Sequence, residues 1–252
     1  MTGKMPDTTY KKAERLISAV EKVSGLPVRV SWDDQLDVGA VLHLSEVKFS
    51  KQLRISVKPN RPDIPYLIGL QCMLAKRFYQ QGETKHLSSS VDCIDKAIND
   101  FLSLGYDEST AKKCADTCIK GLGQQLRSIA PQILFTTQMY RDYPELRDSQ
   151  LTHFLYEKED WIRSLELDKT QFPEWILHTH QAINGTTALA ADYLFERTDF
   201  FEPFKEQGIE AICVGLFGDI TNSKPNTTDT QLVTAWLNRL NLTDCFRWIT
   251  TK

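Results

Sequence analysis

The hydrophobic pattern changes near residue 63, and this change constrains the fold more than any other feature of the chain. Before it, the segments 26–32, 38–47 and 51–59 alternate apolar and polar residues, as half-buried strands do. After it, apolar residues recur every three or four positions, as they do on amphipathic helices. The sequence therefore predicts an α+β fold, with a small sheet near the N-terminus and a mostly helical remainder.

The three strand-like segments lie close together in the sequence, so we expect them to pair as an antiparallel three-stranded sheet. A helix is predicted before them at 7–24, where an apolar face runs up to Gly25, a typical helix end. A second helix is predicted directly after them, beginning at Asp63 as its cap. We therefore interpret residues 1–82 as a helix, three strands and a helix that form one core, and residues 83–252 as a helical elaboration of the same compact domain.

Most of the remaining chain has helical periodicity. The predicted helices cover 90–105, 107–130, 131–144, 147–167, 172–198 and 230–241. The segment 172–198 is long enough for one helix or for a pair broken near Gly185. Periodicity alone leaves 210–220 open between a buried helix and a strand.

Charge and composition narrow the classes of function. The chain has 30 Lys and Arg against 33 Asp and Glu, a net charge of -3, which disfavours a nucleic-acid-binding protein. Its apolar stretches are too short to span a membrane, and its polar N-terminus does not resemble a signal peptide. Six scattered cysteines are typical of reduced thiols in a reducing compartment. We expect a cytoplasmic protein whose partner is another protein.

The residues that could bind zinc do not have the spacing of a metal site. His178 and His180 are two positions apart, so on a helix their rings point to different faces. Cys114 and Cys118 share a helix face, but no second pair lies nearby in the sequence to complete a tetrahedral site. We therefore expect no bound metal and no cofactor.

Two carboxylates leave an alternative open. Asp192 and Glu196 are four positions apart on a predicted helix, where they either face a cleft and do acid–base chemistry or form the polar face of an amphipathic helix. The polar face is the favoured interpretation. The alternative is a hydrolase whose site is assembled from dispersed residues, with Asp192, Glu196, His178, His180, His153 and His43 as the candidates.

The order of elements at 8–82 resembles a known enzyme family. A strand that reads "LRISV" leads through a turn containing Arg and Pro into an amphipathic helix. This pattern resembles the N-terminal region of the ImmA/IrrE-type, zincin-like metallopeptidases, whose helix carries His-Glu-x-x-His. In the matching stretch "LIGLQCM", Gly69 replaces the first His, Leu70 the catalytic Glu and Met73 the second His.

The loss of these residues determines what the resemblance implies. Two His at i and i+4 hold the zinc ion and the Glu deprotonates its water, so Gly, Leu and Met cannot perform the reaction. The resemblance implies a non-catalytic, metallopeptidase-like protein of bacterial type that acts by binding another protein. The helix itself becomes structural, with an apolar stripe for packing on the sheet and with Gly69 allowing the sheet to approach closely. This stripe consists of Tyr66, Leu67, Leu70, Leu74 and Phe78.

Overall fold

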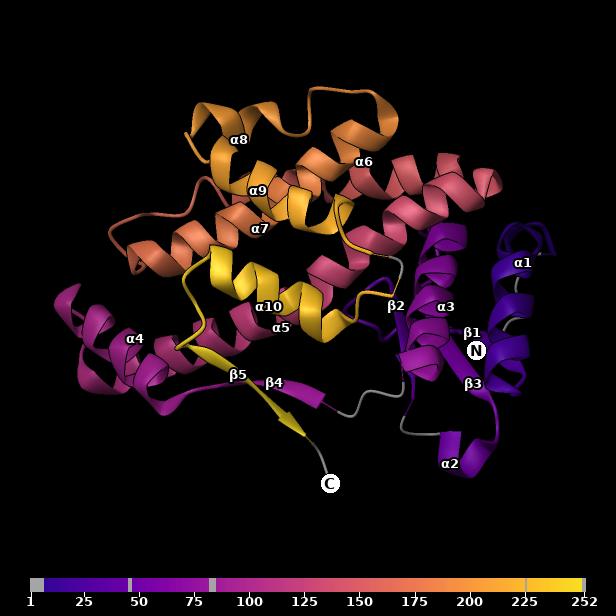
Figure 1. Ribbon diagram of the computed structural model, residues 1–252, viewed down its shortest axis with the longest axis horizontal. Coiled ribbons are helices and arrows are strands. Elements are labelled where there is room, and N and C mark those ends of the chain that lie inside the picture. Colours follow the sequence, from indigo (N-terminus) through magenta and orange to yellow (C-terminus); the bar gives the residue numbers. More distant parts are fainter. Residues whose placement is uncertain (1–6, 45–46, 82–84, 225, 251–252) are drawn as a thin grey trace. The chain divides into compact units, whose positions relative to one another are not determined.

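The computed structural model is an α+β protein in which helices predominate (Figure 1). The structure describes residues 7–44, 47–81, 85–224 and 226–250. A small sheet lies near the N-terminus and most of the later chain is helical, so the predicted fold class is confirmed. Within the described ranges, none of the helices combines the length and the apolar character that a membrane span requires.

The chain divides into two compact units. The first unit comprises Met1–Glu83 and Phe135–Tyr156, and the second comprises Thr84–Leu134 and Glu157–Lys252. Each unit has a hydrophobic core of its own. We expected residues 83–252 to form a helical elaboration of a single compact domain. The segment Phe135–Tyr156 instead belongs to the same unit as the N-terminal core. This segment completes the first unit because its buried side chains pack there.

The first unit contains a mixed sheet with β3 at its centre. Its elements are α1 (Asp7–Ser24), β1 (Val28–Trp32), β2 (Ala40–His43), α2 (Val47–Ser50), β3 (Leu53–Val57), α3 (Ile64–Gln81) and the 3-10 helix η1 (Pro144–Leu146). The strand order is β1-β3-β2, with β1 parallel and β2 antiparallel to β3. The expected all-antiparallel arrangement is therefore wrong. The connection from β1 to β3 contains β2 and α2 and is long enough for a parallel crossover.

Alternating residues of β3 form the floor of the first core. Leu53, Ile55 and Val57 are at most 1% exposed, because α1 and α3 pack over this side of the sheet region. The helix α3 is buried over most of its first three turns. Its predicted apolar stripe ends earlier than expected, since Phe78 is 44% exposed.

The second unit is helical except for a two-stranded ribbon. Its elements are β4 (Lys85–Ser89), α4 (Val91–Ser103), most of α5 (Glu108–Asp142), the end of α6 (Arg147–Arg163), α7 (Glu174–Phe195), α8 (Glu202–Glu206), α9 (Glu210–Thr221), α10 (Asp229–Arg239) and β5 (Phe246–Thr250). The strands β4 and β5 pair in antiparallel register. We did not predict this ribbon, because β4 has a single apolar residue, Leu87, and its partner strand is far away in the sequence.

One helix, α5, replaces the two that were predicted at 107–130 and 131–144. It continues through Pro131, which removes one backbone donor from the helical ladder. Ala130 and Ile133, on either side of the proline, are both buried in the core of the second unit. Burial of this continuous apolar face offsets the local loss, because packing rather than propensity supplies most helix stability.

The helix α7 is continuous through Gly185. A Cβ at Gly185 would lie 2.7 Å from Cys213 Sγ and 2.9 Å from Phe204 Cδ1. The glycine therefore allows α8 and α9 to approach α7 closely, and it does not break the helix. The segment 210–220, for which the sequence allowed either a helix or a strand, forms the helix α9.

Candidate functional site

The positions that match the metallopeptidase motif lie inside the first core. A Cβ at Gly69 would lie 2.7 Å from Met139 Cε and 3.1 Å from Leu146 Cδ1. Leu70 and Met73 are 5% and 7% exposed. We expected Gly69 to allow close approach of the sheet, but the side chains beside it come from α1, from the end of α5 and from η1. This part of α3 is a packing surface, and side chains fill the space that a substrate would need.

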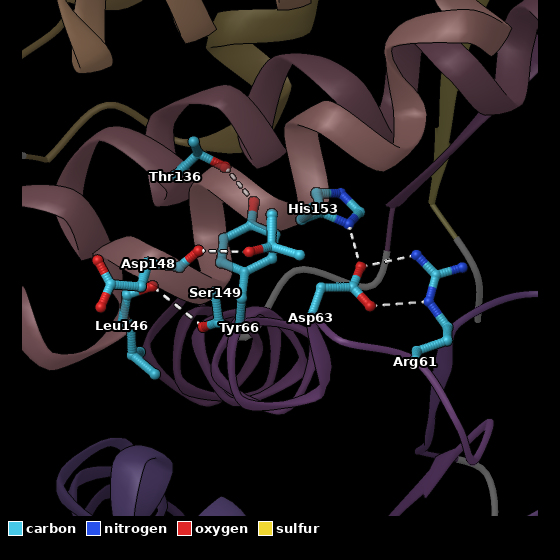
Figure 2. A network of polar contacts seen from close by, with 9 residues as sticks. Arg61, Asp63, Tyr66, Thr136, Leu146, Asp148, Ser149 and His153 are labelled. Atoms are coloured by element: carbon cyan, nitrogen blue, oxygen red, sulfur yellow. Dashed lines mark hydrogen bonds and ion pairs between the residues drawn. The ribbon is translucent and has the colours of Figure 1, made fainter.

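A buried charge network lies at the start of the same helix (Figure 2). Asp63, the residue before α3, is fully buried, and Arg61 donates two hydrogen bonds to its carboxylate, at 2.9 and 2.7 Å. His153, from the first half of α6, approaches the same carboxylate with Nδ1 at 2.7 Å and is 7% exposed. Arg61 also stacks on the ring of Tyr156, with its guanidinium carbon 4.2 Å from the ring centroid.

The partners of Asp63 keep it ionised. Burial alone would raise the pKa of this carboxyl, but the hydrogen bonds and charges of Arg61 and His153 outweigh burial and hold the pKa well below its ordinary range. An ionised carboxylate can only accept hydrogen bonds, so Nδ1 of His153 carries the proton and donates a hydrogen bond to Asp63. The arrangement is a paired buried charge, which is the form in which proteins tolerate one.

The network continues from His153 to Tyr66 and Thr136 (Figure 2). The ring of Tyr66 lies against that of His153, with centroids 4.8 Å apart, and its Oη is 2.8 Å from Thr136 Oγ1. Gln150 Nε2 donates to the backbone oxygen of Thr136 at 2.9 Å. Gln150 Oε1 is the one buried side-chain polar atom in the described part of the chain without a partner.

The Asp63–His153 pair has one property of a catalytic dyad and lacks another. A carboxylate on Nδ1 fixes the tautomer whose Nε2 can accept a proton, as in serine hydrolases. Such a base acts on a hydroxyl or thiol within hydrogen-bond reach. Among the residues that the structure describes, no hydroxyl or thiol bonds to His153, and the Tyr66 hydroxyl is directed at Thr136. The pair therefore fastens α6 to the start of α3.

The two carboxylates proposed from the sequence have separate roles in α7. Asp192 is buried and accepts hydrogen bonds from the backbone N–H groups of Phe200 and Phe201, at 3.2 and 2.9 Å. Burial raises the pKa of Asp192 despite these bonds. Glu196 is exposed and ends the helix in the left-handed conformation, with φ at 52°. Asp192 therefore holds the turn that follows α7, and Glu196 is the exposed residue at which the helix ends.

The candidate histidines also have separate surroundings. His178 is exposed on α7, while His180 is partly buried, with Nδ1 3.0 Å from Gln125 Oε1. His43 lies on β2, with Nε2 2.9 Å from Ser56 Oγ. In the described ranges, no three His, Cys, Asp or Glu side chains lie close enough together to hold a metal ion.

Basic residues form a row across the sheet on the side opposite Leu53, Ile55 and Val57. Arg54 of β3 is in register with Arg29 of β1 and with His43 of β2. Strand side chains alternate between faces, so these three point away from the core. Arg29 is exposed, and the other two are partly exposed. Arg29 and Arg54 give this face of the sheet positive charge.

A hollow of about 390 Å³ lies over this face, and Arg29 and Arg54 line it. Asp33, at the end of β1, lines it too. Asp33 is four residues from Arg29, or about 13 Å along an extended strand. The strand β1 pairs with β3 on one side, and among the described residues no strand pairs with its other side. The face therefore offers a basic end and an acidic end, beside a strand edge where Glu21 Oε1 accepts a hydrogen bond from the backbone N–H of Val28 at 2.9 Å.

Comparisons with known proteins do not assign a family to this chain. Comparisons with protein-family models, curated proteins and solved structures found no match to this chain. The metallopeptidase-like resemblance therefore depends on the residue pattern alone, and the roles of the residues above depend on their contacts.

Sequence reasoning missed the central contact of the charge network. We predicted Asp63 as a helix cap, but its carboxylate binds Arg61 and His153. The Arg-Pro-Asp spacing at 61–63 is a local signal for the first of these pairs. His153 is 90 residues away from Asp63, and no local pattern connects the two.

Proposed function

We propose that this chain is a non-catalytic, metallopeptidase-like module that binds an extended acidic segment of another protein on the outer face of its N-terminal sheet. The row of Arg29, Arg54 and His43 carries this proposal. The positive charges of Arg29 and Arg54 suit the carboxylates of a partner. No described strand pairs with the outer edge of β1, so beyond Val28, whose N–H is bound by Glu21, this edge suits strand addition, in which backbone hydrogen bonds supply affinity and alternate side chains supply specificity.

The packing of α3 supports the non-catalytic part of the proposal. Gly69, Leu70 and Met73 are enclosed by side chains of the first core, so a substrate has no access to them. The alternative, a hydrolase built from dispersed His and carboxylate residues, has no comparable support, because the contacts of Asp192 and Asp63 are those of structural carboxylates.

The test uses defined peptides on the full chain. An octapeptide of alternating valine and glutamate, with blocked ends, should shift the backbone amide NMR signals of β1, and the valine–lysine counterpart should not. Arg29→Glu should weaken binding of the acidic peptide at least about tenfold, because the substitution places like charges together. Arg127→Glu is the matched control, since Arg127 is an exposed arginine of the second unit.

Two results would refute the proposal. One is equal binding of the acidic and basic peptides, since the basic row would then have no role in selection. The other is an equal effect of both charge reversals, since the loss would then reflect overall charge rather than this sheet face.

A further inference from the structure

A pocket in the second unit has the features of a ligand site and shares no lining residue with the hollow over the sheet. It has a volume of about 220 Å³ and lies between α5, α7 and the segment that precedes α7. Its apolar walls include Leu122, Leu177 and Phe172. One face of α5 supplies Cys118, with Gly121, Leu122 and Gln125 at the helical spacings of three, four and seven residues.

The polar groups of this pocket are few and uncharged. His180 Nδ1 is 3.0 Å from Gln125 Oε1, and its Nε2 is 3.3 Å from Asn184 Nδ2. An amide oxygen only accepts and an amide nitrogen only donates, so His180 is the neutral tautomer with its proton on Nδ1. Burial lowers the pKa of His180 and favours the same form. Burial also raises the pKa of Cys118, which keeps this residue a thiol.

The amide nitrogen of Gln125 is left as a donor for a ligand. Gln125 Oε1 is taken by His180, and no acceptor within the described residues takes the Gln125 amide nitrogen. That nitrogen is also not among the buried atoms without a partner, so it reaches open space. No Asp, Glu, Lys or Arg lines the pocket. An ion would be partly desolvated there without a counter-charge, which disfavours charged ligands.

We propose that this pocket binds a small, neutral, largely apolar molecule whose carbonyl oxygen accepts a hydrogen bond from Gln125 Nε2. Engineered apolar cavities of about 150 Å³ hold benzene, so about 220 Å³ suits a ligand of about nine non-hydrogen atoms. Apolar walls with a small number of placed polar groups are the usual composition of such sites.

Gly121 gives a way to close the pocket without disturbing the fold. A Cβ at this position meets no atom within 4 Å, so a larger side chain enters open space. Gly121→Leu fills the pocket from α5 and also replaces a glycine inside a helix, which favours the helix. Gly218→Leu is the matched control, because Gly218 is a helical glycine of α9 whose Cβ position has its nearest neighbour at 3.8 Å.

Three probes of nearly equal shape test the ligand class by NMR titration of the full chain. Acetophenone has the carbonyl, α-methylstyrene replaces it with a methylene group, and benzoate adds a charge. We expect saturable binding of acetophenone with shifts at pocket residues, and at least tenfold weaker binding of benzoate. Gly121→Leu should abolish acetophenone binding, and Gly218→Leu should leave it unchanged.

Gln125→Leu tests the hydrogen bond itself. It should weaken acetophenone about fivefold relative to α-methylstyrene, the effect of one neutral hydrogen bond. The proposal is overturned if acetophenone does not bind, if benzoate binds equally well, or if Gly121→Leu still binds. An equal effect of Gln125→Leu on acetophenone and α-methylstyrene would overturn the assignment of the carbonyl contact.

Discussion

The substitution Asp63→Asn tests whether the buried charge network holds the first unit together. It removes the negative charge while preserving the size of the side chain. Arg61 then loses this counter-charge and His153 loses an ionised hydrogen-bond acceptor, although their side chains are only 13% and 9% exposed. The expected result is a large loss of stability in the first unit, with α3 and the first half of α6 most affected.

The expected magnitude follows from the burial of the pair. Removing one partner of a buried ion pair costs about 3–5 kcal/mol, because the remaining charge stays desolvated. Arg61 keeps its contact with the ring of Tyr156, so we expect the lower end, about 3 kcal/mol. That free energy corresponds to at least about a 100-fold change in an opening equilibrium.

The effect should depend on pH in a specific direction. The pKa of Asp63 is lower in the folded protein than its ordinary value of 3.8, so the unfolded chain binds more protons in the range below 3.8. The stability that Asp63 contributes is therefore fully present above that value and is lost as the pH falls toward the folded pKa. The difference between wild type and Asp63→Asn should shrink over the same range.

Hydrogen exchange provides the measurement, because it reports on each unit separately. Amides of α3 should exchange at least about 100-fold faster in Asp63→Asn at pH 7. The control is Asp199→Asn in the second unit, where Lys158 and Arg197 pair with the carboxylate at 2.7 Å. The pKa of Asp199 is also depressed, but its side chain is 42% exposed, so this substitution should cost less than about 1 kcal/mol.

A loss below about 1 kcal/mol in Asp63→Asn would refute the reasoning, because a buried ion pair could not then be the fastening. A loss that persists unchanged below pH 3.8 would also refute it, since the effect would then come from packing rather than from charge.

Further predictions concern packing, burial and reactivity. Gly185→Ala should lower the free energy of unfolding by about 1–3 kcal/mol, because the added Cβ meets Cys213 and the rigid ring of Phe204. Gly121→Ala should raise it by up to about 1 kcal/mol, because the added Cβ meets no atom and alanine favours the helix. Urea denaturation measures both changes. Burial raises the pKa of Cys72 and of Cys213 to about 12, so iodoacetamide at pH 8 should modify both only after unfolding, as mass spectrometry can show. Wild type should lose stability relative to Asp192→Asn as the pH rises above 3.8, since burial raises the pKa of Asp192 and makes its ionisation costly in the folded state.

Local pattern was sufficient for the elements whose burial follows a single period. The helix at 7–24 and the strand β3 were predicted closely, because each buries one regular face. The ribbon of β4 and β5 was missed because its strands carry little apolar alternation and meet only through the tertiary fold. The continuity of α5 through Pro131 also depended on the packing of its flanks, which outweighs a local breaking signal.

The candidate sites also combine features that local sequence predicts with features that depend on the tertiary fold. The outward direction of Arg54 was predictable from alternation along β3, but its place in a row depended on the strand order. The neutral state of His180 follows from Gln125 and Asn184, which lie on two helices, and spacing alone did not indicate it.

The sequence by itself determined the fold class, most helices and the absence of a His-Glu-x-x-His motif at 69–73, because these depend on residue type and on periodicity over a few turns. Only the tertiary structure decided that Asp63 pairs with His153, that Gly69 is enclosed by Met139, and that a neutral pocket lies in the second unit. The physical reason is that burial and charge pairing depend on contacts between segments distant in the sequence. The free energy of such contacts cannot be deduced from a short stretch of residues.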